Sequence, residues 1–212
     1  MGRRKKEPKS VHRGTIASAA SVLFMEKGIA ATSMDDIARA AGYSKATLYV
    51  YFENKEEIVG LLVLESMKKL DDYLCSALQQ QETTRAKYDS ICQGLVQYQE
   101  EFPFYFQMAL DKININFEKQ EYLPEEKETY LIGEEINQKL KDFFISGIEK
   151  GDFRQDLKPM PTIFSFWGML SGLIQLTVNK EEYIKSSMGL AKNEFLEYGF
   201  RMLYRAIAAL RE

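Results

Sequence analysis

The stretch SMDDIARAAGYSKATLYVYF, residues 33–52, limits most narrowly what this chain can fold into. Ser33 is a good N-cap for a helix, and Gly42 supplies the left-handed residue that commonly ends one. Ser44 can cap a second helix directly afterwards. The spacing therefore predicts two short helices joined by a tight turn, which is a helix-turn-helix.

The second of these helices carries two different faces. Leu48 and Phe52 lie four residues apart and face inward, whereas Lys45, Thr47 and Tyr49 present hydrogen-bond donors outward. In a helix-turn-helix the second helix enters the major groove of DNA. The pattern favours DNA binding, and a helical hairpin that only packs is the alternative.

With its flanks, this segment resembles the DNA-binding domain of the TetR family of bacterial repressors, in particular its AcrR-like members. The resemblance is close over roughly residues 15–62 and is one of architecture beyond them. Two positions depart from the family pattern: Tyr51 stands where His is frequent, and Ala46 where Gly is frequent. The residues that carry the resemblance are Phe24, Gly28, Thr32, Ser33, Ile37, Ala38, Ala41, Gly42, Ser44, Lys45, Thr47, Leu48, Tyr49, Tyr51, Phe52, Asn54, Lys55 and Glu56.

The chemistry of the side chains suggests how the second helix reads DNA. Lys45 suits a guanine edge and the Thr47 methyl group suits thymine. Ala46 and Val50 can touch thymine methyl groups or allow close approach. Tyr49 is also a candidate for a purely structural role. The remaining candidates are phosphate contacts, namely Thr32, Ser33, Ser44, Tyr49 and Tyr51, with Lys55 added by the resemblance.

Composition and charge agree with a basic reading head on an acidic body. Hydrophobic residues make up 45% of the 212 residues, and the chain has five prolines and no strand-like alternation, so an all-α fold is expected. Residues 1–55 hold ten Lys/Arg and five Asp/Glu, while the whole chain has a net charge of −3. We expect the head, residues 1–54, to approach a polyanion.

The body, residues 55–212, is expected to form a larger helical domain that binds an effector and forms a dimer, with about nine helices in the whole chain. Its aromatic and Met residues could line an apolar cavity for a small-molecule inducer, although each could equally be plain core. The candidates for this cavity are Tyr98, Phe102, Phe106, Met108, Phe143, Phe144, Phe166 and Met169.

Two apolar segments near the C-terminus are the expected dimer contact. Residues 161–178 are apolar nearly all round, and residues 194–211 carry a regular helical stripe. Packing within one chain is the alternative. The resemblance favours a homodimer on a palindromic operator, with half-sites about 34 Å apart. The predicted interface residues are Phe164, Trp167, Leu170, Ile174, Leu196, Phe200, Leu203 and Ile207.

Several other classes of protein are disfavoured. His12 is the one histidine and is expected to lie in a flexible basic arm, 1–12, and we find no nucleophile elbow, phosphate loop or metal-ligand cluster. An enzyme, a cofactor and a metal are therefore not expected. Cys75 and Cys92 fit reduced thiols in the cytoplasm, with a redox sensor as the alternative. Residues 163–178 are too short and too polar for a confident membrane span.

The basic arm itself has two interpretations. It is either a solvated tail or an arm that follows DNA phosphates. The rival function that these observations leave open is a helical interaction protein whose basic tail binds an anionic membrane or a partner protein.

Overall fold

The computed structural model describes residues 8–110 and 122–209. Over those residues the chain forms ten helices and no strand, so the predicted all-α class is confirmed. The helices are α1 (Lys9–Lys27), α2 (Met34–Ala40), α3 (Lys45–Tyr51), α4 (Lys55–Gln79), α5 (Thr84–Glu101), α6 (Pro103–Leu110), α7 (Pro124–Glu149), α8 (Pro159–Asn179), α9 (Glu181–Met188) and α10 (Lys192–Ile207).

The chain divides into two compact units. The first comprises the described residues of Met1–Met67 and Gln107–Tyr130, and the second those of Lys68–Phe106 and Leu131–Glu212. Helix α4 begins in the first unit and ends in the second. The boundary expected after residue 54 falls at the start of this helix, whereas the compact units place the division within it.

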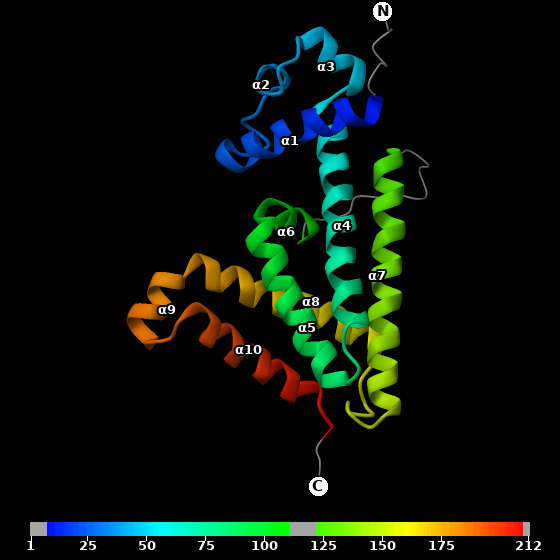
Figure 1. The fold of residues 1–212 in the computed structure, drawn as a ribbon, viewed down its shortest axis with the longest axis vertical. Coiled ribbons are helices and arrows are strands. Elements are labelled where there is room, and N and C mark those ends of the chain that lie inside the picture. The colour runs from blue at the N-terminus through cyan, green and yellow to red at the C-terminus, as the bar shows by residue number, and fades with distance from the viewer. Residues whose placement is uncertain (1–7, 111–121, 210–212) are drawn as a thin grey trace, which may run out of the picture. The chain divides into compact units, whose positions relative to one another are not determined.

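Helices α1, α2 and α3 enclose a small core in the first unit (Figure 1). Ile16, Ala20 and Phe24 of α1 meet Ile37 of α2 and Leu48 of α3, and each of these side chains is at most 4% exposed. These residues recur at helical spacing, so each short helix buries one stripe and leaves its other side to solvent. The three-helix head that the sequence predicted is present.

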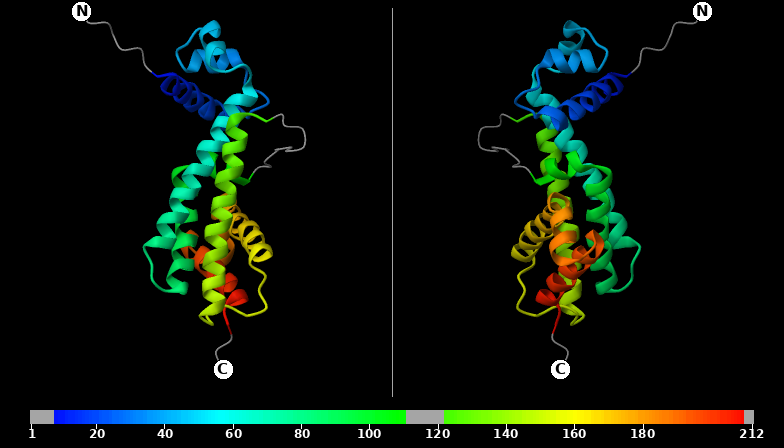
Figure 2. Two further views of the ribbon diagram at one scale, coloured as in Figure 1. Left: turned by 90° about the vertical axis from the view of Figure 1, so that its right-hand side faces the viewer. Right: turned by 90° about the vertical axis from the view of Figure 1, so that its left-hand side faces the viewer.

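Helices α8 and α10 pack on each other in the second unit, and α5 contacts both of them (Figure 2). The approach of α10 to α8 is close because Gly199 has no side chain: a Cβ there would lie 2.5 Å from Leu173 Cδ2. The exposed face of α8 remains rich in apolar residues. At twenty-one residues α8 is long and apolar enough to cross a membrane, which the sixteen-residue segment predicted from the sequence was not.

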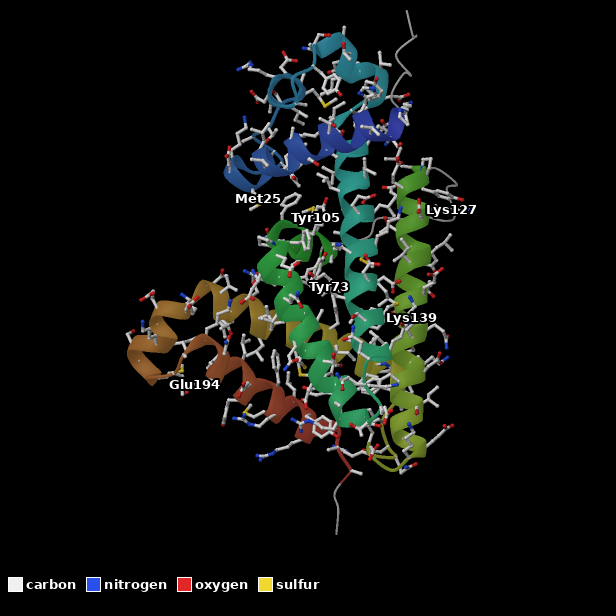
Figure 3. The ribbon with its side chains drawn as sticks, in the orientation of Figure 1. Met25, Tyr73, Tyr105, Lys127, Lys139 and Glu194 are labelled. Atoms are coloured by element: carbon white, nitrogen blue, oxygen red, sulfur yellow. The ribbon has the colours of Figure 1, made fainter. Side chains whose placement is uncertain are left out.

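Polar contacts join the helices around this core. Lys139 on α7 donates to both carboxylate oxygens of Asp71 on α4, at 2.6 and 2.7 Å (Figure 3). Tyr73 on α4 donates its hydroxyl to Glu101 on α5 at 2.6 Å. Burial, together with this carboxylate, raises the pKa of Tyr73 to about 12. The tyrosine therefore stays neutral and holds α4 against α5 at physiological pH.

Candidate DNA-binding surface

The helix-turn-helix is fixed by its caps. Ser33 accepts a hydrogen bond from the amide of Asp36, and the Asp36 carboxylate accepts from the Ser33 amide, which together make a capping box at the start of α2. Ser44 accepts from the amide of Thr47 at the start of α3. Gly42 has a φ of +75°, the left-handed conformation that the turn requires. The predicted capping and turn roles of these three residues are confirmed.

Helix α3 presents one buried and one exposed face. Leu48 is fully buried and Phe52, directly after the helix, is 1% exposed. On the opposite face Val50 is 68% exposed and Tyr49 is 46% exposed, and Ala46 is also exposed. The exposed methyl groups of Val50 suit contact with thymine methyl groups.

The first turn of α3 carries the polar part of this surface. The ammonium of Lys45 lies 2.7 Å from the carboxylate of Asp35 on α2, and both side chains are more than half exposed. The hydrogen bond to Asp35 raises the pKa of Lys45. The hydroxyls of Ser44 and Thr47 are 2.7 Å apart. Lys45 is therefore a surface cation whose partner in this structure is an exposed carboxylate.

Two of the predicted phosphate contacts are engaged inside the head. Thr32 is 1% exposed, and its hydroxyl donates to the carbonyl of Gly28 at 2.8 Å. The ammonium of Lys55 donates to the carbonyls of Ile29 at 2.6 Å and Thr32 at 2.9 Å. Both side chains thus donate hydrogen bonds to backbone carbonyls in the loop between α1 and α2. The structure brings neither of them to the exposed face of α3.

Sequence reasoning missed a group of rings beside α3. His12 lies within α1 and not in a flexible arm, so that expectation was wrong. Its Nδ1 is 2.7 Å from the hydroxyl of Tyr43 in the turn, and its ring packs on Tyr51 at 5.0 Å between centroids. Residues 1–7, which hold most of the basic arm, lie outside the described residues. A histidine three residues into a helix could have been found from the continuous helical pattern starting at Lys9.

The predicted effector residues are mostly core. Tyr98 and Phe106 are at most 1% exposed with ring centroids 5.9 Å apart, and Phe144 lies 6.1 Å from Phe166 in a separate group of rings. Met169 is 41% exposed on α8 and does not share their interior. The other members, Phe102, Met108 and Phe143, are half-buried or buried. Whether any of them contacts an effector stays a prediction.

A groove of about 510 Å³ lies between α5 and α10, away from the predicted effector residues. Cys92, Leu196 and Phe200 contribute apolar surface to it. Lys192 and Glu100 form an ion pair of 2.6 Å, and Glu100 is one of its lining residues. Two further ion pairs line the groove, Arg85 with Asp89 at 2.7 Å and Arg201 with Glu197 at 3.6 Å, so its charged groups are paired.

The predicted dimer residues divide between the inside and the outside of the chain. Leu170, Ile174, Leu196, Phe200 and Ile207 are at most 8% exposed, so the regular stripe on α10 packs within its own chain. This corrects the interface expected for these five side chains. Phe164 is 61% exposed, while Trp167 and Leu203 are half-buried. The exposed apolar residues of the same helices are Phe164, Met169 and Leu176 on α8 with Tyr198 and Met202 on α10.

The residues described contain no group of three or more His, Cys, Asp or Glu that could hold a metal ion. Cys92 is buried, and burial raises the pKa of its thiol to about 12. Cys75 is half-buried. Separately, the exposed face of α3 carries the hydroxyl of Tyr49, the methyl groups of Ala46 and Val50 and the ammonium of Lys45, which are groups that proteins use to contact DNA.

The capped helix-turn-helix, covered by α1 and continued by helices alone in the residues described, defines a helix-turn-helix transcriptional regulator. A family model described as "Bacterial regulatory proteins, tetR family" matches residues 16–62. Residues 16–62 are therefore similar to the DNA-binding head of the TetR family, and the relatives that the chain matches are named as transcriptional regulators.

Comparison with individual proteins agrees with this assignment. The chain is 29% identical over 196 residues to the uncharacterized HTH-type transcriptional regulator YfiR of Bacillus subtilis, a match that covers 89% of this chain and 90% of YfiR. It is 37% identical over 82 residues to the HTH-type transcriptional regulator TtgR of Pseudomonas putida, 39% of each chain. The solved structure of the ketosteroid transcriptional regulator KstR2 of Mycobacterium tuberculosis superimposes with a TM-score of 0.67 at 19% identity, over 98% of this chain and 100% of that one. At that identity the last likeness supports the fold alone.

Proposed function

We propose that the protein is a ligand-responsive repressor that binds an inverted-repeat operator as a homodimer and is released by a small apolar inducer. The observation that carries this proposal is the two-sided α3. Its inner side is anchored by Leu48, while Val50, Tyr49 and Lys45 project from the outer side of the helix that enters the groove in such motifs.

The contacts on DNA divide by chemistry. Lys45 and Thr47 read base edges, and Ala46 and Val50 approach thymine methyl groups. Ser33, Ser44, Tyr49 and Tyr51 hold phosphates. Thr32 and Lys55 contribute indirectly: their donors bond the loop carbonyls just before α2 and so help to orient that helix. The direct contacts therefore come from α3, its cap and the cap of α2.

The apolar surface that α8 and α10 leave uncovered supports the proposed homodimer. Phe164 and Leu176 on α8 and Tyr198 and Met202 on α10 are between 49% and 61% exposed. Gly168 and Gly172 lie one helical turn apart on the open side of α8. A Cβ added at either glycine would meet nothing within 4 Å, so a neighbouring helix could approach closely. A twofold pairing of these faces would give two heads for two half-sites.

The body, residues 55–212, is the proposed effector-binding and dimerisation domain, and the head is residues 1–54. An inducer needs only to prefer the conformation that does not bind DNA, with a coupling free energy of roughly 1–3 kcal/mol. Unpaired Cys75 and Cys92, together with a DNA target, support a cytoplasmic location for the proposed regulator.

Selection of bound duplexes from a random pool tests DNA binding and symmetry together. We expect an inverted repeat whose half-sites are about one helical turn apart. Recovery of no enriched sequence, or of a single asymmetric half-site, would overturn the proposal.

A reporter assay then tests the direction of regulation. The relatives include both repressors and activators of transcription. IcaR of Staphylococcus epidermidis, 39% identical over 59 residues, is named a negative transcriptional regulator. FasR of Mycolicibacterium smegmatis, 38% identical over 73 residues, is named a transcriptional activator. We expect expression from the operator to fall when the protein is present. A ligand screen on the same reporter tests induction, which fails if compounds bind the body and leave operator affinity unchanged.

A further inference from the structure

Three rings from three different segments meet at one edge of the head. His12 comes from the first turn of α1, Tyr43 from the turn between α2 and α3, and Tyr51 from the end of α3. His12 Nδ1 lies 2.7 Å from the Tyr43 hydroxyl, and the His12 and Tyr51 ring centroids are 5.0 Å apart at an interplanar angle of 33°. The two tyrosine rings are 6.2 Å apart.

This ring cluster, His12–Tyr43–Tyr51, lies at the surface rather than in the core. All three side chains are partly exposed, whereas Leu48 and Phe52 beside them are at most 1% exposed. Packing of each ring on the other two fixes their orientations before any ligand arrives. The entropy cost of ordering these hydroxyl and imidazole groups on binding is correspondingly small.

We propose that His12 belongs to the DNA-binding surface: it holds the Tyr43 and Tyr51 hydroxyls against the phosphate backbone and, when protonated, adds a cation at that edge. This inference rests on the proposed binding of an operator. Histidine is the side chain whose charge ordinarily changes between about pH 5 and 8. Each cation placed on a phosphate strengthens binding by releasing condensed counterions.

The groups around the imidazole agree with stronger DNA binding when His12 is protonated. Tyr43 from the turn and Tyr51 from α3 both contact it, and both are phenols, which ordinarily stay neutral near pH 7. On its own helix, Lys9 is one turn earlier and Arg13 is adjacent. The Arg13 guanidinium lies 2.6 Å from Glu125 and is largely neutralised there. A proton on His12 therefore adds positive charge to this edge.

The chain has one histidine, and the α-amino group also titrates near neutral pH, so the part of the pH response that is lost in a His12 variant is the part that belongs to this side chain. The test measures affinity of the full chain for a selected operator at about pH 8 and about pH 6, at constant ionic strength. For the unaltered protein we expect affinity to rise about three- to tenfold at the lower pH. In His12→Gln this rise should disappear, and the slope of log affinity against log salt at about pH 6 should fall by about 0.9.

Ser18→Gln is the matched control, because Ser18 is exposed on α1 and lies outside the ring cluster; it should keep both the pH response and the salt slope. Tyr51→Phe should weaken operator binding, and His12→Gln should cost less in that background if the two residues act together. An unaltered protein that binds no duplex at all would overturn the proposed function. Operator binding with the same pH response in His12→Gln would overturn this inference alone.

A second measurement needs no substitution and covers the case in which His12→Gln fails to fold. The imidazole of the full chain gives a single pair of ring-proton resonances, because there is one histidine. We expect these resonances to shift when operator is added and to stay in place with an equal amount of a non-binding neutral polymer. Resonances that do not respond to operator would overturn the inference.

Discussion

Lys45 sits between two possible partners. In this structure its ammonium is paired with Asp35 across the two helices of the motif, and on DNA it would exchange that carboxylate for a base edge. Because the pair is exposed, it costs little to separate. The Asp35 carboxylate thus orients the Lys45 side chain but binds it only weakly.

We therefore expect Lys45→Ala to weaken operator binding by about 1–3 kcal/mol and binding to random duplex by much less. Titrations of both duplexes at one salt concentration measure the difference. Equal losses on the two duplexes would assign Lys45 to the phosphate backbone.

Asp36 gives the head a dependence on acid. The ammonium of Lys27, at 2.8 Å, and the Ser33 side chain hold the pKa of this carboxyl well below its ordinary value. A group with a lowered folded pKa stabilises the fold above its unfolded pKa, and that contribution is lost as the pH falls. As the pH falls below about 4, the thermal midpoint should therefore decrease more steeply in the unaltered protein than in Asp36→Asn. Parallel pH profiles would contradict this expectation.

The two thiols should differ in reactivity. Burial raises the pKa of Cys92 to about 12, so its thiolate is scarce, while Cys75 is half-buried on α4. We expect one thiol per chain to react with an alkylating reagent in the native protein and both after denaturation. Mass spectrometry of the labelled peptides identifies the site, and fast labelling of Cys92 in the native state would contradict this assignment.

Among the helices, those with a strong cap or an apolar stripe were predictable from sequence. Ser33, Ser44 and Gly42 act as predicted, and Asn54 accepts from the Glu57 amide at the start of α4. Helix α9 is hard to predict from sequence because its eight residues bury one side chain, Ile184, and show no repeating stripe. Local chemistry thus marks where helices begin and end, and a short helix held by its neighbours leaves little trace.

The partner of a helix face was less predictable. The stripe on α10 predicted a buried face correctly, but periodicity cannot tell a neighbouring helix from a second chain, and Leu196 and Phe200 turned out to be buried within their own chain. For Thr32 and Lys55, likewise, the sequence does not identify the group that each side chain contacts. A hydroxyl or ammonium suits a phosphate or a backbone carbonyl equally well, and only the fold shows that carbonyls receive these two.

The connector after α7 packs closely on α7 because residue 147 is a glycine and has no side chain. Phe153 is fully buried, and its ring lies where a Cβ on Gly147 would be, 2.3 Å from Phe153 Cδ2. Phe143 and Phe144, each 5.4 Å away between centroids, leave the ring no room to retreat. We expect Gly147→Ala to lower the free energy of unfolding by about 1–3 kcal/mol. Gly14→Ala is the control, since nothing lies within 4 Å of its Cβ position and alanine favours the helix by up to about 1 kcal/mol; equal midpoints for the two variants would contradict the steric argument.

At the scale of the whole molecule, the exposed apolar faces of α8 and α10 connect one observation with one proposal. They make α8 apolar enough to suggest a membrane segment, and they supply the surface on which the proposed dimer rests. A paired face of this kind would explain why a regulator of DNA carries so apolar a helix.

If the proposed dimer forms through these faces, we expect Met202→Glu to convert it into a monomer, because a carboxylate in an apolar contact would lose its hydration. Sedimentation at several protein concentrations measures the association. Val22→Glu is the matched control: Val22 is 54% exposed on α1 and Met202 is 53% exposed on α10. Loss of association in both variants, or in neither, would contradict the assignment of the interface to α8 and α10.

The position of Lys55 has a mechanical consequence. It is the first residue of α4, and its ammonium closes over the carbonyls of Ile29 and Thr32 just before α2 begins. The two hydrogen bonds are 2.6 and 2.9 Å long, so a shift of the first turn of α4 relative to this loop would lengthen them. A movement of the first turn of α4 would therefore act directly on the loop that leads into α2.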